Sequence, residues 1–225
     1  MQNRQKFMNQ LYLLIGDRLR DRHSGSVREH FWADLDYQKK STRFLENHDE
    51  PRVADIFPEN IHKAAAIISF FCSGMRFFHQ GQLQGWTKKI SVHFSRFPEQ
   101  LSNPNLQEFY GQILKVLNRS LFRNGEWQLR KCNPAWSDNW TWNCFVCFAW
   151  QNPEGHKAIV VVNYADNQSQ CFINLPWESL SKQMYVFKDL VSPEIYIRNR
   201  EEIAAKGLYL DLLPWGYHIF EFHEE

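Results

Sequence analysis

The sequence predicts an α/β segment followed by an all-β segment, because the spacing of its apolar residues changes near the middle of the chain. Before about residue 119, stretches with helical spacing alternate with two short apolar strands. After about residue 125, six short runs rich in valine, isoleucine and aromatic residues are separated by turn sequences. We therefore expect an α/β part over residues 1–124 and an antiparallel β-sandwich over residues 125–225.

The first elements are predicted to be helices. The residues from Gln2 to Asp21 place their apolar side chains on one stripe at helical spacing, and His23–Ser26 breaks that pattern. Val27–Lys40 fits one or two short helices. We expect four of its apolar side chains to face inward: Phe31, Trp32, Leu35 and Tyr37.

A strand, a helix and a second strand follow within about forty residues, which is typical of a parallel βαβ unit. Arg43–Asn47 and Met75–Phe78 are the two predicted strands. The helix between them starts at Pro58 and has Gly74 as the residue that ends it. Another amphipathic helix is predicted from Pro104 to Asn118.

The all-β part is predicted from short runs of strand-forming residues. The six expected strands are Cys144–Trp150, Lys157–Asn163, Gln170–Leu175, Met184–Leu190, Leu208–Leu213 and Tyr217–Phe222. The two parallel strands before them are too few for a parallel sheet, which needs more strands to cover its edges. We therefore expect the α/β part to be the end of a larger assembly.

Composition excludes several classes of protein. The 26 basic and 25 acidic residues give a net charge of +1, so no nucleic-acid partner is expected. Apolar runs such as Ala64–Phe71 are too short to cross a bilayer, so no membrane association is expected. The N-terminal residues do not resemble a secretion signal, and five scattered cysteines favour reduced thiols, so the expected location is cytoplasmic.

The most informative motif is Phe44-Leu45-Glu46-Asn47-His48-Asp49-Glu50-Pro51-Arg52. It places His48 beside Asp49 at the carboxyl end of a predicted parallel strand, where α/β folds carry their functional sites. From the chemistry alone, a capped loop with solvated ion pairs explains the motif equally well.

This motif resembles the last signature region of the alpha-amylase family of glycoside hydrolases, whose core is Asn-His-Asp after the seventh barrel strand. The following Met75-Arg76-Phe77-Phe78-His79-Gln80-Gly81-Gln82 looks like the family's eighth strand and its loop. The resemblance runs in order over nearly the whole chain. It implies the last two strands and helices of a (β/α)8 barrel, followed by the family's antiparallel C-terminal domain.

The resemblance also implies residue roles. Asp49 would be the family's third catalytic carboxylate, which grips sugar hydroxyls and stabilises the transition state, and His48 would bind the substrate sugar. Asn47 would hold the turn, and Arg52 would pair with a neighbouring acid. The implied partner is an α-glucan or α-glucoside; the sequence indicates no cofactor and no metal ligand set.

Two further carboxylates that a retaining glycosidase needs have no counterpart here, and Gly81-Gln82 is followed by Leu83 where the family has Glu. Neither Glu46 nor Glu50 is expected to replace them, since neighbouring side chains on an extended chain diverge. The chain alone is therefore expected to be inactive. Two alternatives stay open: one half of a split enzyme completed by a separate N-terminal barrel half, and a non-catalytic glucan-binding remnant.

The remaining motifs favour structural roles. Cys144 and Cys147 have metal-ligand spacing, but we expect both to be buried on opposite faces of a strand, and no partner is visible for His79 and His93. Exposed Trp136, Trp140 and Trp142 would suit glucan binding, whereas the favoured interpretation packs Trp136 and Trp142 between the two parts of the chain.

Overall fold

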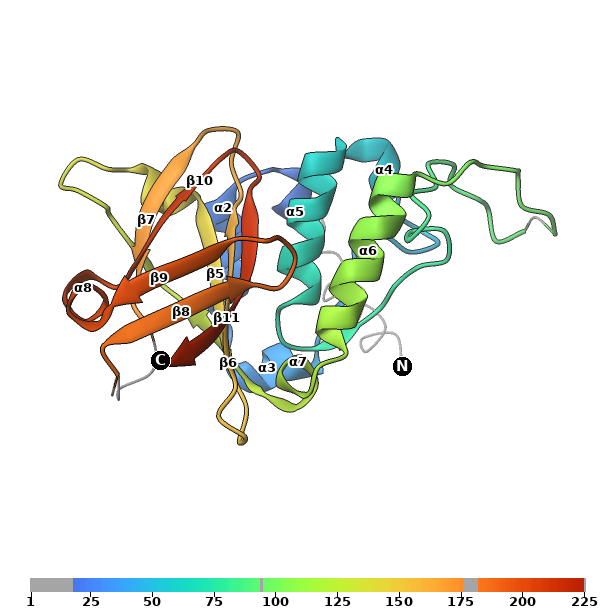
Figure 1. Cartoon of the computed structure of the whole chain (residues 1–225). Coiled ribbons are helices and arrows are strands. Elements are labelled where there is room, and N and C mark those ends of the chain that lie inside the picture. The colour runs from blue at the N-terminus through green and yellow to red at the C-terminus, as the bar shows by residue number, and fades with distance from the viewer. Residues whose placement is uncertain (1–17, 94, 176–181, 225) are drawn as a thin grey trace.

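The computed structural model describes residues 18–93, 95–175 and 182–224 (Figure 1). Most of the helix predicted over Gln2–Asp21 lies outside these residues, and residues 18–20 are helical. None of the described helices is both long and apolar enough to cross a membrane.

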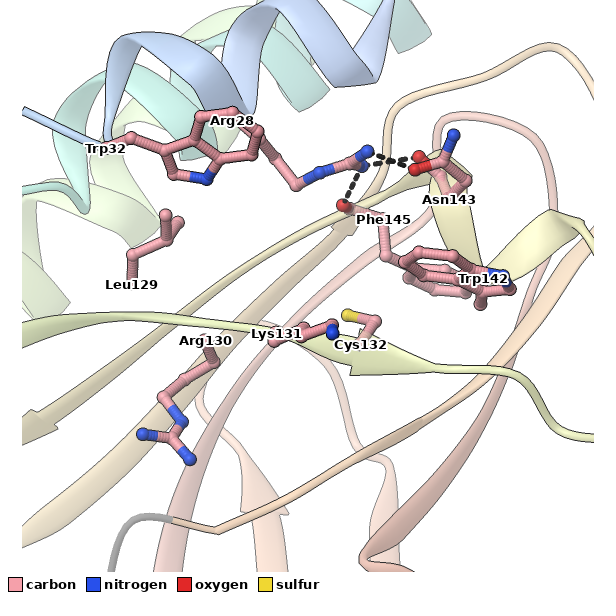
Figure 2. Close-up of a pocket in the computed structure, with 9 residues that line it drawn as sticks. All are labelled: Arg28, Trp32, Leu129, Arg130, Lys131, Cys132, Trp142, Asn143 and Phe145. Carbon is pink, nitrogen blue, oxygen red and sulfur yellow. Dashed lines mark hydrogen bonds between the residues drawn. The ribbon is translucent and has the colours of Figure 1, made fainter.

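Two short helices form from the segment before the first strand, as predicted. Helix α2 is Ser24–His30 and begins within the predicted break at His23–Ser26. Helix α3 is Leu35–Lys40. The prediction that all four apolar side chains face inward was wrong: Phe31 is buried, but Trp32 is 70% exposed and Leu35 is 40% exposed. Phe31 is the C-cap of α2, so the chain has already turned at Trp32, which faces a cavity beside the β-rich part (Figure 2).

The predicted parallel pair is confirmed. Strand β1 (Thr42–Arg43) pairs in parallel with β2 (Met75–Arg76), and helices α4 (Val53–Ile56) and α5 (Glu59–Phe70) lie between them in the chain. Both strands are shorter than predicted. The last backbone hydrogen bond between them runs from the Phe77 amide to the Arg43 carbonyl, and the pairing ends there.

Gly74 does not end helix α5, which stops at Phe70 with Phe71 as its C-cap. Gly74 lies closer to the second strand, with a φ of +119°, and a side chain there would collide with the carbonyl oxygens of Ser41 and Gln38. A glycine is needed at this position because the chain passes so close to the start of β1.

Helix α6 (Pro104–Leu117) confirms the predicted amphipathic helix and is followed by the short α7 (Ser120–Asn124). The Asn103 side chain accepts hydrogen bonds from two backbone amides of the first turn, and Pro104 occupies a position where no amide is needed. Helices α5 and α6 lie side by side against the β-rich part (Figure 1).

The β-rich part contains two antiparallel sheets. The larger has the order β3 (Glu126–Arg130), β5 (Phe145–Gln151), β6 (Lys157–Asn163), β11 (Tyr217–Glu224), β8 (Met184–Asp189) and β9 (Ile195–Asn199). The smaller has the order β10 (Leu208–Leu212), β7 (Ser169–Ile173) and β4 (Cys132–Asn133). A 3-10 turn, η1 (Thr141–Cys144), precedes β5, and helix α8 (Arg200–Lys206) follows β9. All six predicted strands are present, within two residues at each end, whereas β3, β4, β9 and α8 were not predicted.

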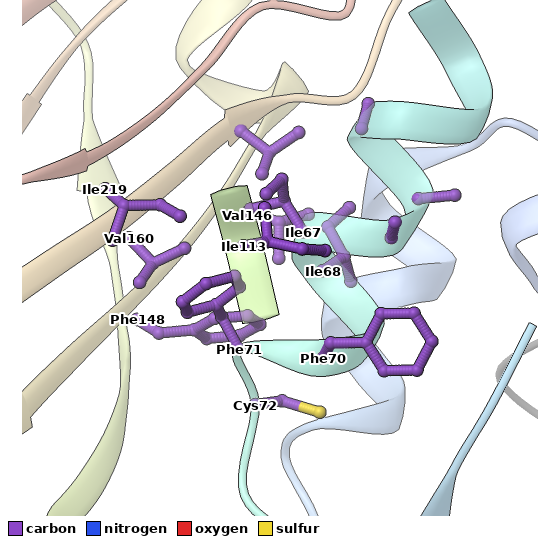
Figure 3. Packing of buried hydrophobic residues seen from close by; sticks show 14 of the residues in the cluster. Ile67, Ile68, Phe70, Phe71, Cys72, Ile113, Val146, Phe148, Val160 and Ile219 are labelled. Carbon is purple, nitrogen blue, oxygen red and sulfur yellow. The ribbon is translucent and has the colours of Figure 1, made fainter. Parts of the chain in front are cut away.

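The central strands bury side chains on both faces. Val146, Phe148 and Val160 belong to a cluster with Ile67 and Phe71 of the α5 region (Figure 3). The intervening residues of β5 and β6 pack in a second cluster with side chains of β7 and β10. The large sheet therefore contacts the helices with one face and the small sheet with the other.

Candidate functional site

The loop that follows β1 is organised by the Asn47 side chain. Its Oδ1 accepts hydrogen bonds from the backbone amides of Asp49, at 2.8 Å, and Glu50, at 3.0 Å. This turn ends the extended segment and directs the next side chains away from the protein interior. Asn47 thus has the turn-holding role expected of it.

His48 and Asp49 are both turned toward solvent. Their side chains are 60% and 78% exposed, and His48 Nε2 lies 3.2 Å from Asp49 Oδ2. Lys89, from the loop after β2, donates from its Nζ to the Asp49 backbone carbonyl. An imidazole and a carboxylate so close together can bind the neighbouring hydroxyl groups of one ligand.

Below this loop lies a buried ion pair. Arg52 Nη1 donates to Glu46 Oε1 at 2.6 Å, with side-chain exposures of 2% and 0%. The other carboxylate oxygen of Glu46 accepts from the Val53 amide at 2.7 Å, at the start of α4. Glu46 precedes the loop, and Arg52 and Val53 follow it. Because Glu46 bonds both of them, a buried contact joins the two ends of the loop that carries His48 and Asp49.

Arg52 also joins this loop to the segment after β2. It donates to the Gln80 carbonyl at 2.6 Å and lies 2.9 Å from His79 Nδ1. Burial and the positive charge of Arg52 lower the pKa of His79, although Glu46 acts in the opposite direction. A neutral His79 accepts a hydrogen bond from the Arg52 guanidinium. The two loops are therefore held together at the carboxyl ends of the parallel strands.

Glu46 and Glu50 are both held in ion pairs with arginines. Glu46 is fully buried in the pair with Arg52, while Asp49 points outward. Glu50 pairs with Arg20. The prediction that Arg52 pairs with a neighbouring acid is confirmed.

The Gly81-Gln82 segment anchors the second loop to helix α6. Gln82 is 1% exposed and donates to the Tyr110 hydroxyl at 2.9 Å, while His62 Nε2 lies 2.8 Å from the same oxygen. Burial raises the pKa of Tyr110 and lowers the pKa of His62 to about 4. This network, which no sequence pattern predicted, joins α5 and α6 beneath the loop.

The cysteines form no metal site among the residues that the structure describes. All five are free and buried, as expected. Cys144 lies in η1 and not in the strand, which corrects that part of the prediction. The Sγ atoms of Cys132 and Cys147 lie 3.1 Å apart, while Cys144 Sγ faces the Asn167 side chain.

The tryptophans do not all pack as predicted. Trp136 is 54% exposed, so its expected position between the two parts of the chain is wrong, and Trp140 is 66% exposed. Trp142 is partly buried against the cluster between the two sheets. The buried side chain of Asn139 holds this segment, accepting from the Trp142 amide and donating to Thr141 Oγ1.

A βαβ unit with its polar loops at the carboxyl ends of the strands, packed on antiparallel sheets, defines the chain's class as an α/β segment joined to an all-β segment. Neither a family model nor a curated protein matches the sequence. The fold of the chain does match solved structures, and these confirm the resemblance to alpha-amylase family enzymes at the level of the fold.

Three of these structures illustrate the match. A noncanonic maltogenic alpha-amylase from Thermotoga neapolitana has a TM-score of 0.71 and 16% identity, over 92% of this chain and 49% of that one. An alpha-amylase from Geobacillus thermoleovorans, complexed with acarbose, has a TM-score of 0.70 and 14% identity, over 96% and 47% of the two chains. The trehalulose synthase of Pseudomonas mesoacidophila has a TM-score of 0.57 and 16% identity, over 89% and 47%. The chain thus spans about half the length of these enzymes.

Proposed function

We propose that this chain is the C-terminal part of an alpha-amylase-like glycoside hydrolase that acts on α-glucosidic bonds with a retaining mechanism. In this proposal residues 1–124 end a (β/α)8 barrel, and residues 125–225 are its antiparallel C-terminal domain. Asp49 stabilises the transition state and His48 binds the substrate sugar. The five free thiols support a cytoplasmic location.

One observation carries the proposal: His48 and Asp49 are exposed side by side at the carboxyl end of a parallel strand, on a loop braced from below. Barrel enzymes carry their catalytic groups at this end of the strands. An exposed pair on a rigid support suits sugar binding, because a fixed geometry avoids the entropy loss of ordering the groups on binding.

The 225 residues supply one of the three carboxylates that the proposed mechanism needs. A retaining glycosidase uses a nucleophile and an acid/base about 5–5.5 Å apart. The two acids nearest to Asp49 in the sequence are held in ion pairs with Arg52 and Arg20. We therefore expect no hydrolysis by this chain alone.

The deciding experiment compares this chain with a longer product that includes the sequence encoded directly upstream of Met1, using release of glucose from maltotriose. The longer product should be active and the shorter one inactive. Asp49→Asn should lower kcat of the longer product by about 10²–10³-fold, as for other groups that stabilise developing charge. Asp55→Asn, an exposed carboxylate on the neighbouring helix α4, is the matched control and should change kcat less than about twofold.

Two outcomes would contradict the proposal. Activity of the longer product that is unchanged in Asp49→Asn would remove the role assigned to Asp49. An upstream sequence encoding no strand that ends in a carboxylate would exclude a continuous glycosidase encoded at this position.

A split enzyme is a second form of the same proposal, with the rest of the barrel supplied by a separate chain. The exposed edge of the parallel pair supports it: within the described residues, β1 and β2 pair only with each other. Met75, in β2, is 62% exposed, and Phe77, the residue just after β2, is 39% exposed. If the barrel is split in this way, mixing the two purified chains should restore activity and yield one complex by gel filtration.

A glucan-binding module is a candidate of a different class, supported by the exposure of Trp136 and Trp140 on a segment held by Asn139. Indole faces stack on sugar rings. It predicts retention of the chain on immobilised starch that is lost in Trp140→Ala and unaffected in Asp49→Asn. Retention that depends on Asp49 instead would favour the glycosidase proposal.

A further inference from the structure

A cavity of about 480 Å³ lies between helix α2 and the segment that runs from β3 to β4 (Figure 2). Pockets of roughly 300–1,000 Å³ hold small-molecule ligands in other proteins. The cavity is lined by residues of the α/β part and of the β-rich part, and it is separate from the loop that carries His48 and Asp49. Its properties therefore do not depend on the proposed function.

Among the described residues, the lining is positively charged and contains no carboxylate. Arg28, Arg130 and Lys131 all contribute to it. The Arg130 guanidinium turns away from Arg28 in Figure 2 and donates to the Asn174 carbonyl at 2.8 Å. Arg28 and Lys131 are left as the two cationic groups for a ligand in the cavity.

Arg28 has only neutral acceptors among the described residues that it bonds. Its Nη1 donates to the Phe145 carbonyl at 2.8 Å and to the Asn143 carbonyl, and its Nη2 donates to the Asn143 side chain. These bonds use three of the five guanidinium N–H groups. Burial lowers the pKa of Arg28, so the charge is held in a partly dehydrated position where an anion would stabilise it.

An indole stands beside these charges. Trp32 is 70% exposed, and in Figure 2 it projects from the end of α2 on the same side as Arg28. Trp142 lines the cavity at its other end. An exposed tryptophan in the same cavity lining as two cationic side chains provides a stacking surface and an anion site within one small volume.

We propose that this cavity binds a phosphate monoester carried on a ring, with the phosphate between Arg28 and Lys131 and the ring against Trp32. A phosphate monoester carries nearly two charges at neutral pH and three acceptor oxygens, which matches a cavity lined by two cationic donors. A sugar phosphate and a nucleoside monophosphate both present this chemistry, and the experiment separates them.

The test is calorimetric titration of the full 225-residue chain with glucose 6-phosphate, AMP, inorganic phosphate and glucose at pH 7.5. At least one ring phosphate should bind, inorganic phosphate should bind about fivefold or more weakly, and glucose should not bind measurably. Binding of glucose 6-phosphate alone identifies a sugar phosphate site, and binding of AMP alone identifies a nucleotide site.

Two exposed residues allow the site to be changed without disturbing the core. Lys131→Gln should weaken binding of the ring phosphate about tenfold, and Trp32→Ala about fivefold or more. Lys115→Gln on helix α6 and Phe97→Ala, an exposed aromatic residue outside the cavity lining, are matched controls that should stay within about twofold of the unmodified chain. Circular dichroism of each variant checks that the fold is retained.

Three results would overturn the proposal. They are the absence of binding by both ring phosphates, equal binding of inorganic phosphate, and affinities unchanged by both Lys131→Gln and Trp32→Ala. Glycosidase activity is not measured in any arm, so this proposal and the proposed function fail independently.

Discussion

Replacing Arg52 with methionine is expected to lower the free energy of unfolding by about 3–5 kcal/mol. The substitution removes the 2.6 Å bond to Glu46 and leaves that carboxylate fully buried without its counter-ion. It also removes the donor to the Gln80 carbonyl, which joins the loops after β1 and β2. In a chain of this size, each kcal/mol lowers the melting temperature by about 2–4 °C, so Tm should fall by roughly 10 °C.

Urea unfolding followed by far-ultraviolet circular dichroism measures this change. Lys63→Met is the matched control, because it removes a 2.6 Å pair with Glu59 whose side chains are 24% and 34% exposed. It should change stability by less than about 1 kcal/mol. The double variant Glu46→Gln, Arg52→Met should be more stable than Arg52→Met, because the buried charge is gone. An Arg52→Met chain within 1 kcal/mol of the unmodified chain would refute this account of the loop.

Three further predictions concern stability. The pKa values of His30 and His62 are both lowered to about 4, chiefly by burial, so the unfolded chain binds more protons between pH 6.5 and pH 4. Stability should therefore fall as the pH drops through this range, by up to about 3 kcal/mol for each histidine; urea midpoints that do not change between pH 7 and pH 5 would contradict this. Gly74→Ala should lower stability by at least about 1 kcal/mol, because its φ is +119° and its Cβ would meet the Gln38 carbonyl at 2.9 Å. Gly111→Ala, in α6 with open space around it, should instead raise stability by about 0.5–1 kcal/mol, and equal effects of the two substitutions in thermal unfolding would exclude this explanation.

Element types were predictable where the apolar pattern was strong. Lys157–Asn163 was predicted to the residue, because a run of alanine, isoleucine and valine between turn sequences leaves little alternative. Strand β9 was missed although Ile195, Tyr196 and Ile197 form a short strand-like run. It lies at the sheet edge with both isoleucines more than half exposed, so burial does not reinforce its pattern.

The parts of the site that could not be predicted depend on burial of polar groups. Spacing alone indicated that Glu46 and Asp49 diverge, but not that Glu46 would be fully buried against Arg52. Arg43 is likewise 1% exposed and bonds the Ser73 carbonyl and His30. Charged residues are rarely fully buried, so a local sequence pattern favours the surface for each of them. The exposure of Trp32 and Trp136 was missed for the opposite reason, because large aromatic residues are expected inside.

The burial of both faces of β5 and β6 affects how their pairing register is chosen. A strand with one polar face rejects a one-residue slip, because the slip would bury its polar side chains. Strand β6 has no polar, solvent-exposed face to exclude such a slip, since six of its seven residues are buried. Two polar contacts discriminate instead: Trp150 Nε1 donates to the Phe71 carbonyl at 2.8 Å, and the Tyr164 hydroxyl donates to the Leu19 carbonyl at 2.7 Å. A slipped strand would leave these donors buried and unpaired, so hydrogen bonds to the α/β part contribute to the alignment of the central sheet. The buried Asn163 side chain at the end of β6, which donates to three carbonyls, contributes as well.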